Sequence, residues 1–257
     1  MKIAMLFLLL TLAISSFGGE AYFLDPSFDG PFLTSSAIAV YMAAQLDRYL
    51  TPPILNTLSK DNLPGLDKTA VGNYSNGMKA TSKHLLAFTA LPVVIGIYGE
   101  SRGYTYFDAL TDGIMYLESC FLTYSMCTYI NGFEFRPRPI AYNTDLPDDV
   151  RRTGDNSKGF YSLNTALLAN TVCFTNAVFS KRFPDSKLNK VLLIGGWSAV
   201  CVMGYTQVKS GQHFPTDVLF GALFGAATGY GIPDAHLYHH NVDFDIMLSG
   251  LQLTYHF

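Results

Sequence analysis

Long apolar runs separated by short polar loops dominate the chain from about residue 35 to residue 230. Their length and their mixture of apolar and small residues are typical of helices that are buried in a core or contact lipid. The predicted helices are Ser35–Leu50, Ser82–Tyr98, Tyr106–Ile130, Ser162–Phe179, Leu188–Thr206 and Val218–Tyr230. Strand-like alternation is absent before the last sixteen residues, so we expect an all-α helical bundle.

The stretches outside the predicted helices carry residues that break helices. Tyr22–Gly30 is predicted to be a loop, and Leu55–Tyr74 is polar and rich in turn residues. Polar side chains such as Asp112 and Glu118 interrupt the apolar runs. They leave open whether the helices form a buried soluble core or span a membrane.

The C-terminal residues change to a period of two. The apolar residues are Val242, Phe244, Ile246 and Leu248, followed by Leu251, Leu253, Tyr255 and Phe257. A turn at Ser249-Gly250 would pair residue 248 with residue 251 and residue 242 with residue 257, which puts all these apolar residues on one face. We therefore predict a C-terminal β-hairpin, which should pack on the bundle or a membrane surface because an isolated hairpin is marginally stable.

The N-terminal residues have the pattern of a secretory signal. Lys2 precedes the apolar run Ile3–Ile14, and small residues follow. The run is short for a membrane span, although an uncleaved anchor is the alternative. We expect an exported protein, either periplasmic or in the inner membrane with its site facing the periplasm. The expected division is a signal peptide at 1–21, a helical domain at 22–235 and a C-terminal tail at 236–257.

Composition argues against one class of partner. Hydrophobic residues make up 49% of the chain and charged residues 14%, and the net charge is -3. Without a basic stripe, this composition gives no support for nucleic-acid binding. The cysteines lie in apolar runs without C-x-x-C spacing, so we expect mostly buried free thiols. They are Cys120, Cys127, Cys173 and Cys201.

The first candidate site is the stretch QVKSGQHFPTD between the last two predicted helices, from Gln207 to Asp217. Pro215 is tolerated near a helix start, and Thr216 or Asp217 could cap the helix that follows. His213 would then lie at a helix N-terminus, which attracts anions. Asp217 is close enough in sequence to hold the imidazole in one tautomer. The alternative is a histidine that simply satisfies a helix cap.

Two further stretches carry groups suited to an anion. The loop GFEFRPRPIAYN contains Arg136 and Arg138 between prolines, which offers charged forks suited to phosphate oxygens. An arginine pair with a capping or interface role is the alternative. In KGFYSLNTALLANT, a loop turns into a helix near Ser162, whose hydroxyl and N–H could bind an anion. Ser162 as a plain N-cap would look the same.

Together, the three stretches resemble the type 2 phosphatidic acid phosphatase/haloperoxidase superfamily in order and spacing. The segment LDKTAVGNYSNGMKATSKHLLAFTALP also looks like the start of that family's first core helix. The resemblance covers most of the chain after the signal. It implies a bundle with about six core helices and a site where helix ends meet.

The motifs of this family are only partly kept. The matching positions are Arg138, Ser162, His213 and Asp217. The departures are Asn131 in place of a lysine, Asn164 in place of a histidine and Gln207 in place of an arginine. Positive charges near the motifs could compensate, namely Arg136, Arg151, Arg152, Lys158 and Lys209.

The resemblance implies a mechanism that these departures impair. The histidine that matches His213 attacks phosphorus, and the aspartate that matches Asp217 orients it. The histidine missing at Asn164 protonates the leaving oxygen, which an amide cannot do, and general acids contribute about 10²–10⁴ in rate. The cations missing at Asn131 and Gln207 bind phosphoryl oxygens, and losing one such group costs about 10²–10³.

Two function hypotheses follow from the resemblance. The first is a degenerate envelope protein that keeps a phosphate or lipid-phosphate pocket with little or no turnover. The second is an active acid-phosphatase-type enzyme that dephosphorylates lipid phosphates or diphosphates through a phosphohistidine at His213. Haloperoxidase activity ranks third, because vanadate is held by the same missing cations.

The remaining histidines give no metal site in the sequence. They are His84, His236, His239, His240 and His256. The cluster HLYHH has no carboxylate spaced as a further ligand, so we expect a solvated loop after the last helix and no metal or cofactor. The expected partners are a lipid phosphate or other phosphorylated small molecule and a membrane, but not a nucleic acid.

Overall fold

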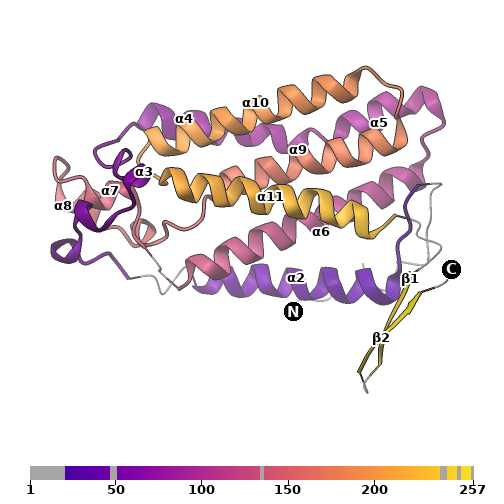
Figure 1. Cartoon of the computed structure of the whole chain (residues 1–257), viewed down its shortest axis with the longest axis horizontal. Helices are drawn as coiled ribbons and strands as arrows, with labels where there is room; N and C mark the ends of the chain where they lie inside the picture. Colours follow the sequence, from indigo (N-terminus) through magenta and orange to yellow (C-terminus); the bar gives the residue numbers. More distant parts are fainter. Residues whose placement is uncertain (1–20, 47–50, 134–135, 238–241, 248–249, 256–257) are drawn as a thin grey trace.

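The structure is a computed structural model that describes residues 21–46, 51–133, 136–237, 242–247 and 250–255. Within these ranges the chain is mainly helical, which confirms the predicted helical fold (Figure 1). The long helical segments are α2 (Pro26–Leu46), α4 (Asn76–Leu85) continued through η4 (Leu86–Ala90) into α5 (Val93–Gly99), α6 (Tyr106–Asn131), α9 (Leu163–Arg182), α10 (Leu188–Lys209) and α11 (Pro215–Ala235).

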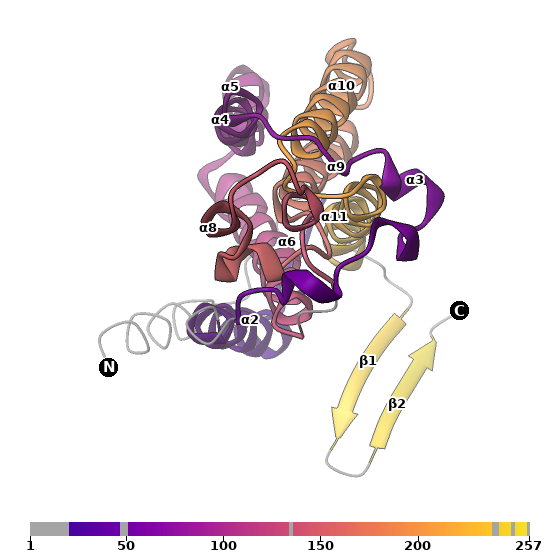
Figure 2. The ribbon, with the colours of Figure 1, turned by 90° about the vertical axis from the view of Figure 1, so that its left-hand side faces the viewer.

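Short helical turns gather at one end of the bundle, on the left in Figure 1. They are η2 (Leu55–Thr57), η3 (Lys60–Asn62), α3 (Gly65–Lys68), α7 (Pro139–Tyr142), α8 (Asp148–Arg151) and η6 (Gly154–Ser157). Viewed along the bundle, these turns lie over the ends of the long helices (Figure 2). All three stretches that were predicted as candidate sites begin or end at this end of the bundle.

Helix α9 is the centre of the bundle and lies very close to α11. Gly221, Gly225 and Gly229 recur at every fourth residue of α11 and so line one face. A Cβ atom on Gly225 would lie 2.0 Å from the carbonyl oxygen of Ala166 in α9. Only glycine permits this approach, and it places the beginning of α9 beside the beginning of α11.

The first helix starts earlier than predicted. The residues Tyr22–Gly30 were expected to be a loop, but α2 already begins at Pro26. The side chain of Asp25 accepts a hydrogen bond from the N–H of Ser27 at 2.8 Å, which satisfies a free donor at the helix start. Gly30-Pro31, which resembles a turn signal, lies inside the helix, where Pro31 has no N–H to donate to the carbonyl oxygen of Ser27.

At the C-terminus, β1 (Val242–Met247) and β2 (Gly250–Tyr255) pair antiparallel and project from the bundle (Figure 2). Val242 lies opposite Tyr255, not opposite Phe257, so the predicted register is wrong by two residues. A shift by two residues preserves the alternation of apolar positions, so the pattern cannot choose between the registers. Packing of the hairpin on the bundle or a membrane stays a prediction.

Among the described residues, two helical segments are long and apolar enough to cross a membrane, Asn76–Arg102 and Leu188–Lys209. Several large apolar side chains are exposed on the outer faces of α10 and α11. They include Val191, Ile194 and Val202 on α10, and Leu219, Phe220 and Leu223 on α11. The predicted signal peptide at 1–21 falls almost entirely outside the described residues.

Candidate functional site

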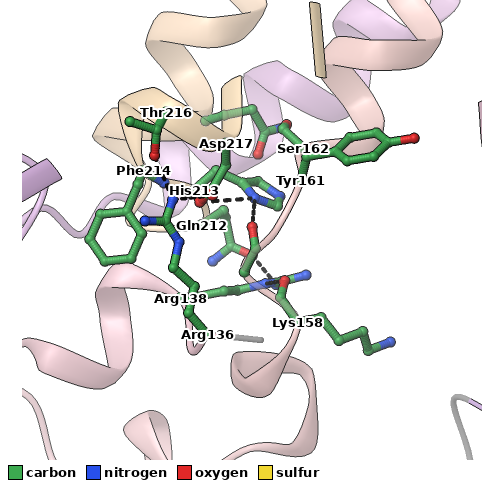
Figure 3. A network of polar contacts seen from close by, with 12 residues as sticks. Arg136, Arg138, Lys158, Tyr161, Ser162, Gln212, His213, Phe214, Thr216 and Asp217 are labelled. Atoms are coloured by element: carbon green, nitrogen blue, oxygen red, sulfur yellow. Dashed lines mark hydrogen bonds and ion pairs between the residues drawn. The ribbon is translucent and has the colours of Figure 1, made fainter. Parts of the chain in front are cut away.

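The three candidate stretches meet at the loop end of the bundle (Figure 3). The turn from α10 to α11 brings in His213, the segment before α7 brings in Arg136 and Arg138, and the segment before α9 brings in Ser162. The turn depends on Gly211, whose φ of +73° favours glycine, and a Cβ there would lie 2.4 Å from the carbonyl oxygen of Asn73. The structure thus brings together the predicted site residues of separate motifs.

His213 is buried, with 7% of its surface exposed, and is oriented by the main chain. Its Nδ1 lies 2.8 Å from the carbonyl oxygen of Gly159. Because a carbonyl oxygen can only accept, Nδ1 must carry the proton, which leaves a lone pair on Nε2 of the neutral ring. Asp217, the predicted orienting group, has Oδ2 4.0 Å from Nδ1, which is too long for a hydrogen bond.

Asp217 is instead occupied by other partners. Its Oδ2 accepts a hydrogen bond from the N–H of Phe214 at 2.8 Å, so it caps α11 from within the first turn. Its Oδ1 forms a short ion pair with Arg136. The carboxylate therefore holds the start of the helix against the Arg136 loop, and its contacts are those of an anchoring group.

Arg136 was a candidate compensating cation, but it is neutralised inside the protein. Besides Asp217, it donates to Asp67 of α3 at 2.8 Å and to the hydroxyl of Thr216 at 2.6 Å. Asp67 also accepts hydrogen bonds from the N–H and the hydroxyl of Thr216, at 3.1 Å and 2.7 Å. Both carboxylates are fully buried. Their negative charges raise the pKa of Arg136, although burial alone would lower it.

Arg138 differs from Arg136 in its partners. Its Nε donates to the carbonyl oxygen of Lys158 at 3.1 Å and its NH1 to the side-chain oxygen of Gln212 at 2.6 Å. These two acceptors are uncharged oxygen atoms, and together they fix the orientation of the guanidinium. Burial, and then the charge of Arg138, lower the pKa of His213 from 6.5 to about 3. The imidazole is therefore neutral across the physiological pH range.

Ser162 precedes the first residue of α9 but does not cap it with its side chain. Its hydroxyl shares a hydrogen bond with the hydroxyl of Thr165 at 2.9 Å, and its N–H donates to the carbonyl oxygen of Asp217 at 3.1 Å. The side chain is fully buried. Ser162 thus joins the start of α9 to the start of α11, and the backbone N–H that was predicted for an anion is already used.

The three departing positions carry amides with weak or few partners. The side-chain nitrogen of Gln207 lies 3.7 Å from the sulfur of Met203, and that of Asn131 lies 3.3 Å from the sulfur of Cys127. The side-chain oxygen of Asn131 is buried without a hydrogen-bond partner. Asn164 is half-buried in the first turn of α9. None of the three supplies a charge or a transferable proton at this end of the bundle.

Most of the other candidate compensating cations are engaged elsewhere. Arg151 donates to the carbonyl oxygen of Ala141 through Nε and NH2, and Lys158 pairs with Asp155 at 3.2 Å. Lys209 lies over the ring of Tyr205. Arg152 is exposed. Among the described residues, the charges that lower the pKa of His213 are that of Arg138 and, more weakly, that of Arg136.

The sequence reasoning missed several residues of this network. Gln212 and Gly159 lie inside the stretches that were predicted as candidate sites, so their position next to the motif residues could have identified them. Asp67 lies in a turn-rich segment with no pattern that marks it. His236 was expected in a solvated loop, but it is 6% exposed and contacts Asp29 at 3.0 Å, so that prediction is wrong.

Comparison with known proteins places the chain in a family. The model of the PAP2 superfamily matches residues 112–240, which is just over half of the chain and includes all three motifs. A similar solved structure is the first transmembrane PAP2-type phosphatidylglycerolphosphate phosphatase from Bacillus subtilis. It is 19% identical, with coverage of 78% of this chain and 94% of that chain and a TM-score of 0.46. No curated protein is significantly similar. The chain belongs to the PAP2 superfamily.

Proposed function

We propose that this protein binds the phosphate group of a lipid or other small phosphorylated molecule at the cell envelope and turns it over slowly or not at all. The observation that carries the proposal is the site's polar network. His213 is held by a carbonyl oxygen, and Asp217 and Arg136 form an ion pair with each other. The positions that need a general acid and two cations hold Asn164, Asn131 and Gln207.

The environment of His213 disfavours a covalent intermediate. Attack by Nε2 on phosphorus forms an N–P bond as the P–O bond to the leaving group breaks, and it leaves positive charge on the ring until Nδ1 loses its proton. The lowering of the His213 pKa from 6.5 to about 3 corresponds to roughly 5 kcal/mol against a cationic ring. A bound phosphate offsets part of this cost. A carboxylate on Nδ1 would offset more, but Gly159 offers only a dipole.

Retained phosphate binding rests mainly on Arg138. Its guanidinium is positioned by hydrogen bonds to the carbonyl oxygen of Lys158 and the side chain of Gln212, and its charge acts on His213 more strongly than that of Arg136. Gln212 would have to release NH1, or share it, when phosphate binds. The substrate class follows from the family, and the exposed apolar residues of α10 and α11 support association with a membrane.

The experiment is a binding titration with inorganic phosphate and with a short-chain phosphatidate, using Arg138→Ala and its control Arg152→Ala. Arg152 is exposed and carries the same charge. We expect Arg138→Ala to weaken phosphate binding at least about tenfold, since charged hydrogen bonds contribute about 1.5–3 kcal/mol. The Arg152 variant should bind like the wild type. Equal affinities for all three proteins would contradict the proposal.

A second candidate function is an active phosphatase for substrates with good leaving groups. One observation favours it: His213 is neutral and its Nε2 keeps a lone pair, as a nucleophile requires. A lipid diphosphate needs less help from a general acid than a monoester does. Under this alternative, His213 attacks, Arg138 and Ser162 bind the phosphate, and Asp217 supports the site indirectly.

We further propose that the chain is exported, with a signal peptide at 1–21, a PAP2-type helical domain at 22–235 and a tail at 236–257. The site would then face the periplasm. Signal cleavage can be checked by N-terminal sequencing of the mature protein, and carbonate extraction distinguishes an integral membrane protein from a soluble one.

A further inference from the structure

A buried cluster of three ionisable side chains lies far from the phosphate site. Asp29 comes from α2, Glu118 from α6 and His236 directly follows α11; their exposed fractions are 1%, 0% and 6%. Helix α6 packs against both α2 and α11, which brings the three side chains together (Figure 1). One ligand atom from each lies within 4.8 Å of the others. His213 precedes α11 and His236 follows it, so the 21 residues of this helix, about 31 Å in length, separate the two sites.

The hydrogen bonds of His236 determine which ring nitrogen faces the carboxylates. Nδ1 lies 2.8 Å from the carbonyl oxygen of Ile232, which can only accept, so Nδ1 carries a proton. Nε2 lies 3.0 Å from Oδ1 of Asp29 and 3.3 Å from Oε2 of Glu118. In the neutral ring, a lone pair on Nε2 therefore points at two oxygen atoms. A proton or a metal ion must lie between them.

A proton on Nε2 leaves the cluster incomplete. It would satisfy one hydrogen bond to Asp29 and supply one positive charge against two carboxylates. In the described part of the chain, Oδ2 of Asp29 and both oxygens of Glu118 are buried without a hydrogen-bond partner. Buried carboxylate oxygens without partners are costly, so native proteins rarely leave three of them together. A divalent cation would neutralise both carboxylates and bind these oxygens.

We infer that Asp29, Glu118 and His236 form a structural site for a divalent transition-metal ion of the Zn²⁺ type. Zinc binds one imidazole nitrogen and two carboxylate oxygens at about 2.0–2.2 Å, so ligand atoms of a tetrahedral site lie roughly 3.3 Å apart. The observed separations from Nε2 are 3.0 Å and 3.3 Å. The second oxygen of either carboxylate, or a water molecule, supplies the fourth ligand.

Other observations agree with this choice of ion. A hydrogen bond from the second imidazole nitrogen to a main-chain carbonyl is the usual support of a metal-binding histidine, and Ile232 provides it. Ca²⁺ and Mg²⁺ prefer six or more oxygen ligands, whereas this cluster offers a nitrogen and two carboxylates. The site would fasten the start of α2 to α6 and to the end of α11. Both carboxylates are remote in sequence from His236, and Asp29 is separated from it by 207 residues. No sequence motif therefore revealed this site.

The test uses the full-length protein after treatment with a chelator, titrated with Zn²⁺ against a chromophoric competitor. We expect one site per chain, and we expect Glu118→Gln and Asp29→Asn each to weaken it at least about tenfold, because even groups that only support ligands contribute 10–100-fold. The double variant His239→Ala/His240→Ala removes neighbouring histidines of the sequence and should keep the site. Wild-type affinity in both carboxylate variants, or no stoichiometric zinc, would overturn the inference.

A second readout covers the case in which a variant fails to fold. Zn²⁺ should raise the melting temperature of the wild-type protein and of the His239/His240 variant, since an ion that binds only the folded state stabilises it. Co²⁺ bound to the wild type should give the intense visible absorption of a tetrahedral site. An unchanged melting temperature together with an octahedral Co²⁺ spectrum would show that the cluster holds a proton instead.

Discussion

Removal of the Arg136 side chain is expected to destabilise the loop end of the bundle strongly. Arg136 joins Asp67 of α3 to Asp217 of α11, and both carboxylates are fully buried. Breaking a buried pair leaves an uncompensated charge and costs about 3–5 kcal/mol. Here one substitution leaves two carboxylates without their cation, so the loss in Arg136→Ala should lie at the upper end of this range. Such a loss is a large share of the 5–15 kcal/mol that typically stabilises a folded protein.

The assay is denaturant unfolding in the presence of a fixed detergent, followed by far-ultraviolet circular dichroism. Arg152→Ala is the matched control, because Arg152 is exposed and should change the free energy of unfolding by less than about 0.5 kcal/mol. Adding Asp67→Asn to Arg136→Ala should restore part of the loss. A loss below about 1 kcal/mol for Arg136→Ala would refute the reasoning.

Two further changes test the packing and the buried histidine. The pKa of His213 is lowered to about 3, so only the unfolded chain binds its proton between about pH 3 and pH 6.5. His213 should therefore lower the free energy of unfolding by roughly 2 kcal/mol from pH 6.5 to pH 4.5, a contribution that is absent from His213→Gln, so denaturant titrations of both proteins at both pH values should differ by this amount. Gly225→Ala places a Cβ 2.0 Å from the carbonyl oxygen of Ala166 and should lower the free energy of unfolding by about 1–3 kcal/mol or more. Gly231→Ala should not lower it, because a Cβ there would have nothing within 4 Å. Thermal unfolding of the two variants compares them directly.

The helices were predictable because their apolar runs are long and their ends are marked. The predicted start of the helix at Leu188 is the one observed, and Tyr106–Ile130 differs from α6 by one residue at its end. The start of α2 was missed because Gly30-Pro31 resembles a turn, although both residues lie inside the helix. The hairpin register was missed because a shift by two residues leaves the apolar alternation unchanged.

The meeting of Arg138, Ser162 and His213 was predictable only through the resemblance to a family. Their pairwise contacts were not, since a short spacing does not decide which way a side chain points. Asp217 follows His213 by four residues, yet it binds Arg136, whose other carboxylate partner, Asp67, comes from a distant turn. Such long-range pairs carry no signal in a single sequence.

The most direct test of the central claim is phosphate release that depends on His213. Purified protein is incubated with a phosphatidate, a polyprenyl diphosphate and a p-nitrophenyl phosphate ester, beside His213→Ala. We predict little or no release by the wild type above that of this variant for any of the three substrates. Rapid release by the wild type that disappears in His213→Ala would contradict the claim and would show that the site still catalyses phosphoryl transfer efficiently.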